Sequence, residues 1–76
     1  MKDLIKYIAQ AMVDHPEQVE VSEVEGDRIL VIELKVAKED MGLIIGKQGR
    51  NVQAIRTILG ATSGKLKKRT ILEIIE

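Results

Sequence analysis

Cysteine, phenylalanine and tryptophan are all absent from the 76-residue sequence, and Tyr7 is its only aromatic residue. The lack of cysteine excludes disulfides and thiolate metal sites, and it fits a reducing compartment. The lack of large aromatic side chains means that a core must be built from Ile, Leu and Val. At this length the chain has room for one small domain, residues 1–76, whose folding buries only about 60% of the unfolded chain's surface.

Long hydrophobic runs are also missing, since none approaches the roughly 18 apolar residues that a membrane-spanning helix requires. The first residues include Lys2, Asp3 and Lys6, a pattern unlike a secretory signal peptide. We therefore expect a soluble cytoplasmic protein without a membrane partner. Catalytic groups are equally scarce, because His15 is the only histidine and no paired acids lie near a nucleophile. We expect no enzyme activity, no metal site and no cofactor, and we interpret His15 as a residue at a helix end.

The net charge is zero, but the two signs of charge are segregated along the chain. No Lys or Arg lies between Tyr7 and Asp27, and no Asp or Glu lies between Met41 and Leu72. Residues 1–40 carry 5 basic and 10 acidic side chains, a net charge of −5, whereas the remaining residues carry 7 and 2, a net charge of +5. This polarity favours an anionic partner on one face; the alternative is a bipolar solvated surface.

The spacing of apolar residues predicts six elements in the order αββααβ. Helical spacing predicts a first helix over residues 1–13, which ends before Pro16 because a residue that precedes proline is disfavoured in the helical region. Alternation predicts strands over residues 19–24 and 28–36, and the second is expected to be central because both of its faces carry apolar residues. The turn between them contains Gly26, which is free to adopt a positive φ.

The second half of the chain is predicted to contain two short helices and a final strand. One helix spans residues 37–45, and the other begins near Arg50 and carries an apolar stripe up to Leu59. Residues 60–69 are predicted to form a cationic loop, followed by a strand over residues 70–76. A hairpin makes the first two strands antiparallel, and a two-helix crossover makes the second and third parallel. We therefore expect an α+β fold, with a three-stranded mixed sheet and three helices packed on one face.

The stretch "IIGKQGRN" (residues 44–51) places two glycines around a lysine and a glutamine. A Walker-type nucleotide loop is excluded, because three residues instead of four separate Gly42 from Gly46, and Gln48 replaces the hydroxyl that would hold magnesium. A dinucleotide fingerprint is excluded because this loop follows a predicted helix instead of a strand. What remains is a Gly-x-x-Gly turn between helices, whose uncovered backbone and adjacent helix N-terminus suit a sugar–phosphate chain. The alternative is a plain helix corner, with Gly49 serving only as a cap.

The context of this loop resembles that of a KH domain, in which a Gly-x-x-Gly loop clamps about four nucleotides of single-stranded nucleic acid. The order αββααβ is similar to the type II, bacterial arrangement, and "EDMGLIIGKQGRNVQAIRTIL" (residues 39–59) is the segment closest to that family. The whole chain resembles the small bacterial single-KH proteins of the KhpA family. One departure is Leu43, where type II domains often carry a lysine, so the groove would have one phosphate contact fewer.

The resemblance implies an RNA-binding protein that grips the backbone of a short single-stranded segment and acts as a post-transcriptional regulator or RNA chaperone. Its partners would be single-stranded RNA and either a second copy of the chain or a second KH-containing protein similar to KhpB. The alternative is a KH-fold module for protein–protein contact or dimerisation, with little RNA binding of its own. The near absence of aromatic side chains predicts weak base selectivity.

The candidate RNA-binding residues belong to the loop and to a second basic cluster. Lys47 and Arg50 would neutralise phosphate, and Gln48 would either hydrogen-bond to it or present the loop amides. Ile45 and Val52 would offer apolar surface to bases, although both are also needed as core residues, and Ile55 is interpreted as a core residue. The second cluster, which consists of Lys65, Lys67, Lys68 and Arg69, either contacts phosphate or is a solvated surface. The complete set is Ile45, Gly46, Lys47, Gln48, Gly49, Arg50, Val52, Gln53, Lys65, Lys67, Lys68 and Arg69.

Overall fold

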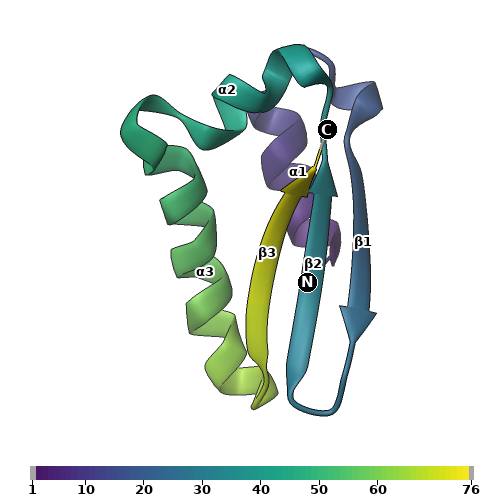
Figure 1. Ribbon diagram of the computed structural model, residues 1–76, viewed down its shortest axis with the longest axis vertical. Helices are drawn as coiled ribbons and strands as arrows, with labels where there is room; N and C mark the ends of the chain where they lie inside the picture. Colours follow the sequence, from purple (N-terminus) through teal and green to yellow (C-terminus); the bar gives the residue numbers. More distant parts are fainter. Residues whose placement is uncertain (1, 76) are drawn as a thin grey trace.

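The computed structural model describes residues 2–75, apart from the side chains of Thr62, Ser63, Lys65 and Leu66. The main elements appear in the predicted order αββααβ, with three short 3₁₀ turns between them (Figure 1). They are α1 (Lys2–Met12), η1 (Pro16–Gln18), β1 (Glu20–Glu25), β2 (Ile29–Lys35), η2 (Lys38–Asp40), α2 (Met41–Ile45), η3 (Lys47–Gly49), α3 (Arg50–Leu66) and β3 (Arg69–Ile75).

The sheet has the predicted mixed topology. Its strand order is β1-β2-β3, with β1 antiparallel to β2 and β2 parallel to β3. The central position of β2 is therefore confirmed, and both β1 and β3 are edge strands. The positive φ predicted for Gly26 is wrong, because the described glycines with positive φ are Gly46 and Gly49. The Gly26 N–H donates a 2.7 Å hydrogen bond to the carbonyl of Ile29. This bond is the last one between β1 and β2, so the two residues after Gly26 form the turn.

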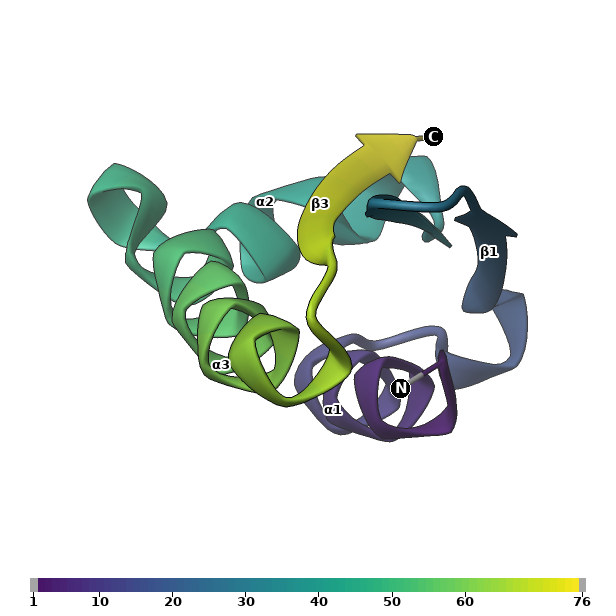
Figure 2. The same ribbon diagram turned by 90° about the horizontal axis from the view of Figure 1, so that it is seen from below.

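The core is aliphatic, as the composition predicts. Alternation along β2 buries Leu30, Ile32 and Leu34. Figure 2 shows α1 and α3 on the same side of the sheet, and the predicted α+β fold with its helices on one face is confirmed. Burying one such aliphatic side chain contributes about 1.5–3 kcal/mol. The other buried members of the core come from α1, α2, α3 and β3 and from the segments that precede β1 and follow β2, and they are Ile5, Ala9, Val19, Val36, Ile44, Val52, Ile55, Leu59 and Leu72.

Helix α3 is longer than predicted, because the segment expected to be a loop continues the helix to Leu66. Glycine in a helix interior costs only about 1 kcal/mol, so the exposed Gly60 and Gly64 do not stop the helix from continuing. The buried Leu59, which is 1% exposed, lies on the packed side of this helix. The helix ends where Lys67 takes a left-handed φ of 56°, a usual way to terminate a helix.

A buried carboxylate joins the start of α2 to the segment that follows α1. Asp40 is 1% exposed and accepts hydrogen bonds from the backbone N–H of His15 (3.0 Å) and from its ring Nδ1 (3.1 Å). The hydrogen bond and the charge of Asp40 raise the pKa of His15 above its ordinary value of 6.5, with smaller contributions from Glu17 and Glu39. The interpretation of His15 as a residue at a helix end is therefore incomplete. The hydrogen bonds between His15 and Asp40 also hold the segment after α1 against the start of α2.

Replacing Gly60 or Gly64 with alanine should stabilise the protein. A Cβ built at either position meets no atom within 4 Å, so alanine adds helix propensity without a clash, about 0.4–1 kcal/mol at each site. Urea unfolding of each variant measures the gain. The matched control is Ala61→Gly, on the same exposed stretch, which should lose a similar amount. A loss of stability in both alanine variants would contradict a helix that extends to Leu66.

The contribution of His15 to stability should depend on pH. Because its pKa is raised in the folded state, folding favours the protonated ring; the contribution is complete below the unfolded pKa of about 6.5 and is lost as the pH rises through the folded pKa. Urea unfolding of the wild type and of His15→Gln at several pH values between about 5.5 and 8.5 tests this. The difference in unfolding free energy should shrink as the pH rises. A difference that is constant over this range would contradict the charged pair.

Candidate nucleic-acid interface

The chain changes direction between α2 and α3 in a four-residue turn, Gly46 to Gly49. Three of its four residues have a positive φ: Gly46 (75°), Gln48 (59°) and Gly49 (74°). The N–H of Gly46 donates to the carbonyl of Gly42 (2.8 Å) and ends α2, and the N–H of Gly49 donates to the carbonyl of Gly46 (3.1 Å) and tightens the turn. This backbone leaves Lys47 and Gln48 at an exposed tip, which we call the loop tip.

Gly46 is the most constrained position of the turn. Its φ of 75° and ψ of 172° lie in a region that is essentially restricted to glycine. A Cβ at this position would lie 2.6–2.8 Å from three side-chain atoms of Asn51. Asn51 cannot easily move away, because its Nδ2 donates a 2.8 Å hydrogen bond to the carbonyl of Leu43 and ties the first turn of α3 to α2. At Gly49 the nearest atom to an added Cβ would be 3.9 Å away, so only its φ favours glycine.

The loop tip lies beside the N-terminus of α3. A helix of 17 residues begins at Arg50, and its first N–H groups have no partner within the helix and carry partial positive charge. Lys47 and Arg50 are both exposed. Within the described part of the chain, neither forms an ion pair with a carboxylate. The side chains and the helix end therefore present positive charge to the same region of solvent.

Apolar side chains next to the loop divide into an exposed set and a buried set. Leu43 and Ile45 are each 40% exposed and offer apolar surface beside the turn. Val52 and Ile55 are buried, at 8% and 2% exposure. The interpretation of Ile55 as a core residue is therefore confirmed, whereas Val52 has little surface left for the contact with bases that the sequence suggested.

A polar stripe continues from the loop along α3. Arg50, Gln53 and Arg56 are three residues apart and all exposed. Each is a neighbour of the next on the helix surface, and the row turns by about 120° around the helix axis from Arg50 to Arg56. Arg56 was not among the candidate residues, although its spacing from Gln53 is a signal that could have identified it. The stripe extends the basic surface about 9 Å from the start of the helix, at 1.5 Å per residue.

The second basic cluster lies at the opposite end of α3 from the loop (Figure 1). The helix is about 25 Å long, from 17 residues at 1.5 Å each, so the two groups do not form one compact site. Lys67 is exposed, and the side chain of Lys65 lies outside the described residues. The Lys68 Nζ pairs with Oε2 of Glu25 on the hairpin at 3.0 Å. Arg69 begins β3 and faces an open pocket.

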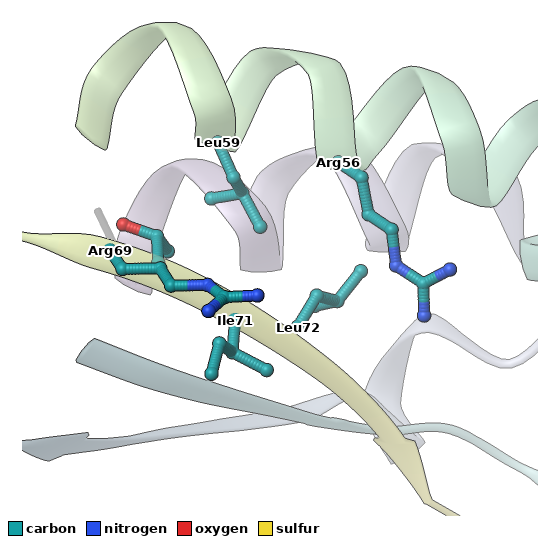
Figure 3. Close-up of a pocket in the computed structure, with 6 residues that line it drawn as sticks. Arg56, Leu59, Arg69, Ile71 and Leu72 are labelled. Atoms are coloured by element: carbon teal, nitrogen blue, oxygen red, sulfur yellow. The ribbon is translucent and has the colours of Figure 1, made fainter. Parts of the chain in front are cut away.

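This pocket, which we call the α3–β3 pocket, brings Arg69 together with Arg56. Figure 3 shows Arg56 extending from α3 and Arg69 from the start of β3 toward the space between the two elements. The pocket has a volume of about 320 Å³. Its lining residues are Arg56, Leu59, Arg69, Thr70, Ile71 and Leu72.

Other kinds of site find little support in the described residues. No group of three or more His, Cys, Asp or Glu side chains there is arranged to hold a metal ion. Among the same residues, no helix combines the length and the apolar character needed to cross a membrane.

Comparison with known proteins gives close relatives over nearly the whole chain. The model of a family described as "KhpA/KhpB, KH domain" matches residues 2–74. A protein named "RNA-binding protein KhpA" from Caldanaerobacter subterraneus subsp. tengcongensis is 59% identical over 75 residues, which cover 99% of this chain and 100% of the relative. A protein with that name from Clostridium acetobutylicum is 53% identical, over 99% of this chain and 100% of the relative. Another from Aquifex aeolicus is 46% identical, over 100% of this chain and 96% of the relative. No solved structure gives a significant match. The name shared by these relatives describes RNA binding and not an enzyme.

Alanine at Gly46 should be far more damaging than alanine at Gly49. Gly49→Ala should lower the unfolding free energy by about 1–2 kcal/mol, mainly because alanine is unfavourable in the left-handed conformation. Gly46→Ala should lower the unfolding free energy by about 1–3 kcal/mol because alanine is strained in this backbone region. It should also lose the Asn51 hydrogen bond, which contributes about 0.5–1.5 kcal/mol. Urea unfolding of both variants measures the difference, and Asn51→Ala isolates the hydrogen bond. Equal losses at the two glycines would show that the contact between Gly46 and Asn51 does not constrain the turn.

Proposed function

The chain belongs to the KhpA/KhpB KH-domain family, and from this premise we propose that it binds RNA by gripping the backbone of a short single-stranded segment at the turn from Gly46 to Gly49. The observation that carries the proposal is the loop tip, where an uncovered, positively charged backbone turn meets the N-terminus of α3. The relatives named as RNA-binding proteins match almost the full chain, which supports the same activity here.

The turn suits a phosphate backbone for three physical reasons. Two glycines at its ends leave the main chain open to close approach by a polymer. The Arg50 N–H already donates to the carbonyl of Lys47, and the first turn of α3 beyond it offers N–H groups and the positive end of the helix dipole to phosphate oxygens. Lys47 and Arg50 have no carboxylate partner within the described chain, so their charge is available to replace the counterions of the RNA. Gln48, held in a left-handed conformation, projects an amide that donates to the same phosphates.

The remaining candidate residues have unequal roles in this proposal. Ile45 supplies exposed apolar surface for a base, and Gln53 extends the polar surface along α3. Val52 acts mainly through the core, because it is 8% exposed. The charge of Lys68 is partly neutralised by Glu25. We assign Lys65 and Lys67 a long-range electrostatic contribution, since they lie at the far end of α3 from the loop tip.

A grip on the backbone suits a cytoplasmic protein that contacts many RNAs, as a post-transcriptional regulator or an RNA chaperone, because phosphate contacts carry no sequence information. We also propose that the domain works in pairs, as a homodimer or with a second KH-containing protein similar to KhpB. The family model covers both kinds of protein by name. Pairing would add avidity to a domain of 76 residues that has a small binding surface. The exposed Leu4 and Tyr7 of α1 are apolar surface available for such a contact.

Replacing Lys47 and Gln48 together with aspartate should abolish most RNA binding and leave the fold intact. The variant loses two contacts worth about 1.5 kcal/mol or more each, so the Kd for a single-stranded RNA should rise about 100-fold or more. Fluorescence anisotropy with a labelled oligonucleotide at several salt concentrations measures this. The wild-type affinity should fall with salt, and the variant should have a shallower slope.

The matched control for this double variant is Lys6→Asp with Gln18→Asp, which makes the same change of charge at two exposed positions on α1 and η1. This control should retain most of the wild-type affinity. Thermal unfolding of both double variants checks that each remains folded. Wild-type affinity in the Lys47/Gln48 variant, or an equal loss in the control, would contradict the assignment of the loop tip.

A further inference from the structure

Asp40 is a buried charged group that the proposed grip on RNA does not use. It is 1% exposed and lies at the N-cap of α2, where an aspartate usually accepts a hydrogen bond from the first turn of its own helix. Here the side chain makes no such bond. Its Oδ2 accepts instead from the backbone N–H and the ring Nδ1 of His15. The carboxylate therefore joins α2 to the segment that follows α1.

Helix α2 depends on contacts of this kind for its position. It contains five residues, far fewer than the roughly 12–15 that a helix needs to be stable alone. Its start is held by Asp40, and the fully buried Ile44 packs into the core. Near its end, the carbonyl of Leu43 accepts the hydrogen bond from Asn51. Of these contacts, the one at Asp40 includes a group that titrates near neutral pH, the ring of His15.

The same helix connects Asp40 to the RNA-binding turn. Five residues at 1.5 Å each span about 7.5 Å, and the N–H of Gly46 donates to the carbonyl of Gly42 inside the helix. A hydrogen-bonded helical segment moves as a unit. A shift at Asp40 therefore changes the direction in which α2 enters the turn at Gly46.

The charge of the His15 ring decides how firmly the pair holds. The side chain of His15 is 39% exposed, whereas that of Asp40 is 1% exposed, so the ring exchanges protons with solvent while the carboxylate depends on its partner. A hydrogen bond between ionised partners is about twice as strong as a neutral one. A neutral ring can still donate from Nδ1, but it leaves the buried charge unbalanced, which is unfavourable away from water.

The other charged groups around the ring favour its protonated form. The hydrogen bond to Asp40 and the charge of Asp40 raise the pKa of the ring most, partial burial opposes them, and Glu17 of η1 and Glu39 of η2 add to the rise. Asp14 and Lys38 are further charged residues of the same two segments, and the ion pairs of the described residues include neither. The ring therefore loses its proton at a pH above its ordinary pKa of 6.5.

We propose that His15 and Asp40 are positioning residues for RNA binding: the protonated pair fixes the start of α2 and holds the turn from Gly46 to Gly49 in the geometry that grips RNA, so that RNA affinity falls when the ring loses its proton. The inference rests on the proposed RNA binding by the loop. Neither His15 nor Asp40 is required to touch the RNA. The coupling is reciprocal, so bound RNA must also make the ring harder to deprotonate.

The first test is the pH dependence of RNA affinity. Fluorescence anisotropy with labelled oligo-U, whose bases do not titrate in this range, gives Kd between about pH 5.5 and 8 at constant ionic strength. The wild-type Kd should rise about fivefold or more with pH, the lower end of the usual coupling between two sites. His15→Gln keeps a polar side chain without a titratable ring, and its Kd should vary far less. Both proteins keep the α-amino group, which also titrates in this range, so the comparison removes its contribution.

The other outcomes of this test contradict the proposal. A wild-type Kd that is constant with pH overturns it, and so does an equal pH dependence in His15→Gln, because another group would then be responsible. Thermal unfolding at each pH checks that both proteins remain folded. Failure of the wild type to bind oligo-U at any pH would overturn the proposed RNA binding itself, and this result is distinct from binding that does not depend on pH.

The second test needs no substitution at the pair. NMR titration of the ring of His15, the only histidine, gives its pKa with and without saturating oligo-U. The pKa should be higher in the complex, by the logarithm of the fold-change in Kd. The matched control is Gln18→His, which adds a second ring at an exposed position of η1 and reports the direct effect of the RNA charge. A rise at His15 that is no larger than the rise at this second ring would overturn the proposal.

Discussion

The turn between α2 and α3 depends on the absence of a side chain at residue 46. The carboxamide of Asn51 fills the space where a Cβ would lie, 2.6–2.8 Å from the position of that atom, and its hydrogen bond to Leu43 holds the two helices together. Because the helices are held in this way, the loop tip projects into solvent and α3 begins directly beside it. The stripe along α3, the α3–β3 pocket and the proposed RNA path all follow from the direction in which α3 leaves this turn.

The segregation of charge in the sequence becomes a spatial separation in the fold. Acidic residues are concentrated in β1 and its hairpin, and basic residues in the loop and α3. The ribbon places β1 and α3 on opposite sides of the sheet's central strand (Figure 1). The ion pair between Glu25 and Lys68 marks where the two regions meet. An exposed pair of this kind contributes at most about 1 kcal/mol, so the separation bears on the choice of partner more than on stability. An anionic polymer is attracted to the basic side and repelled by the other.

Local patterns predicted the parts of the structure that local physics determines. Alternation placed Leu30, Ile32 and Leu34 in the core, and helical spacing placed Ile55 there. The extent of α3 was missed because Gly60 and Gly64 suggest a loop, whereas a glycine in a helix interior costs only about 1 kcal/mol and does not end the helix. The pair between His15 and Asp40 joins residues 25 positions apart, and no periodicity reports such a contact. The same holds for the α3–β3 pocket, which both Arg56 and Arg69 line only because β3 returns alongside α3.

The central claim is that the loop from Gly46 to Gly49 holds the RNA. Amide chemical shifts of the labelled protein during titration with a short single-stranded RNA test it most directly. The largest changes should occur from Gly46 to Asn51 and continue along α3 toward Arg56, while the amide shifts of β1 remain unchanged. Changes centred on β1, with the loop amides unmoved at saturating RNA, would contradict it.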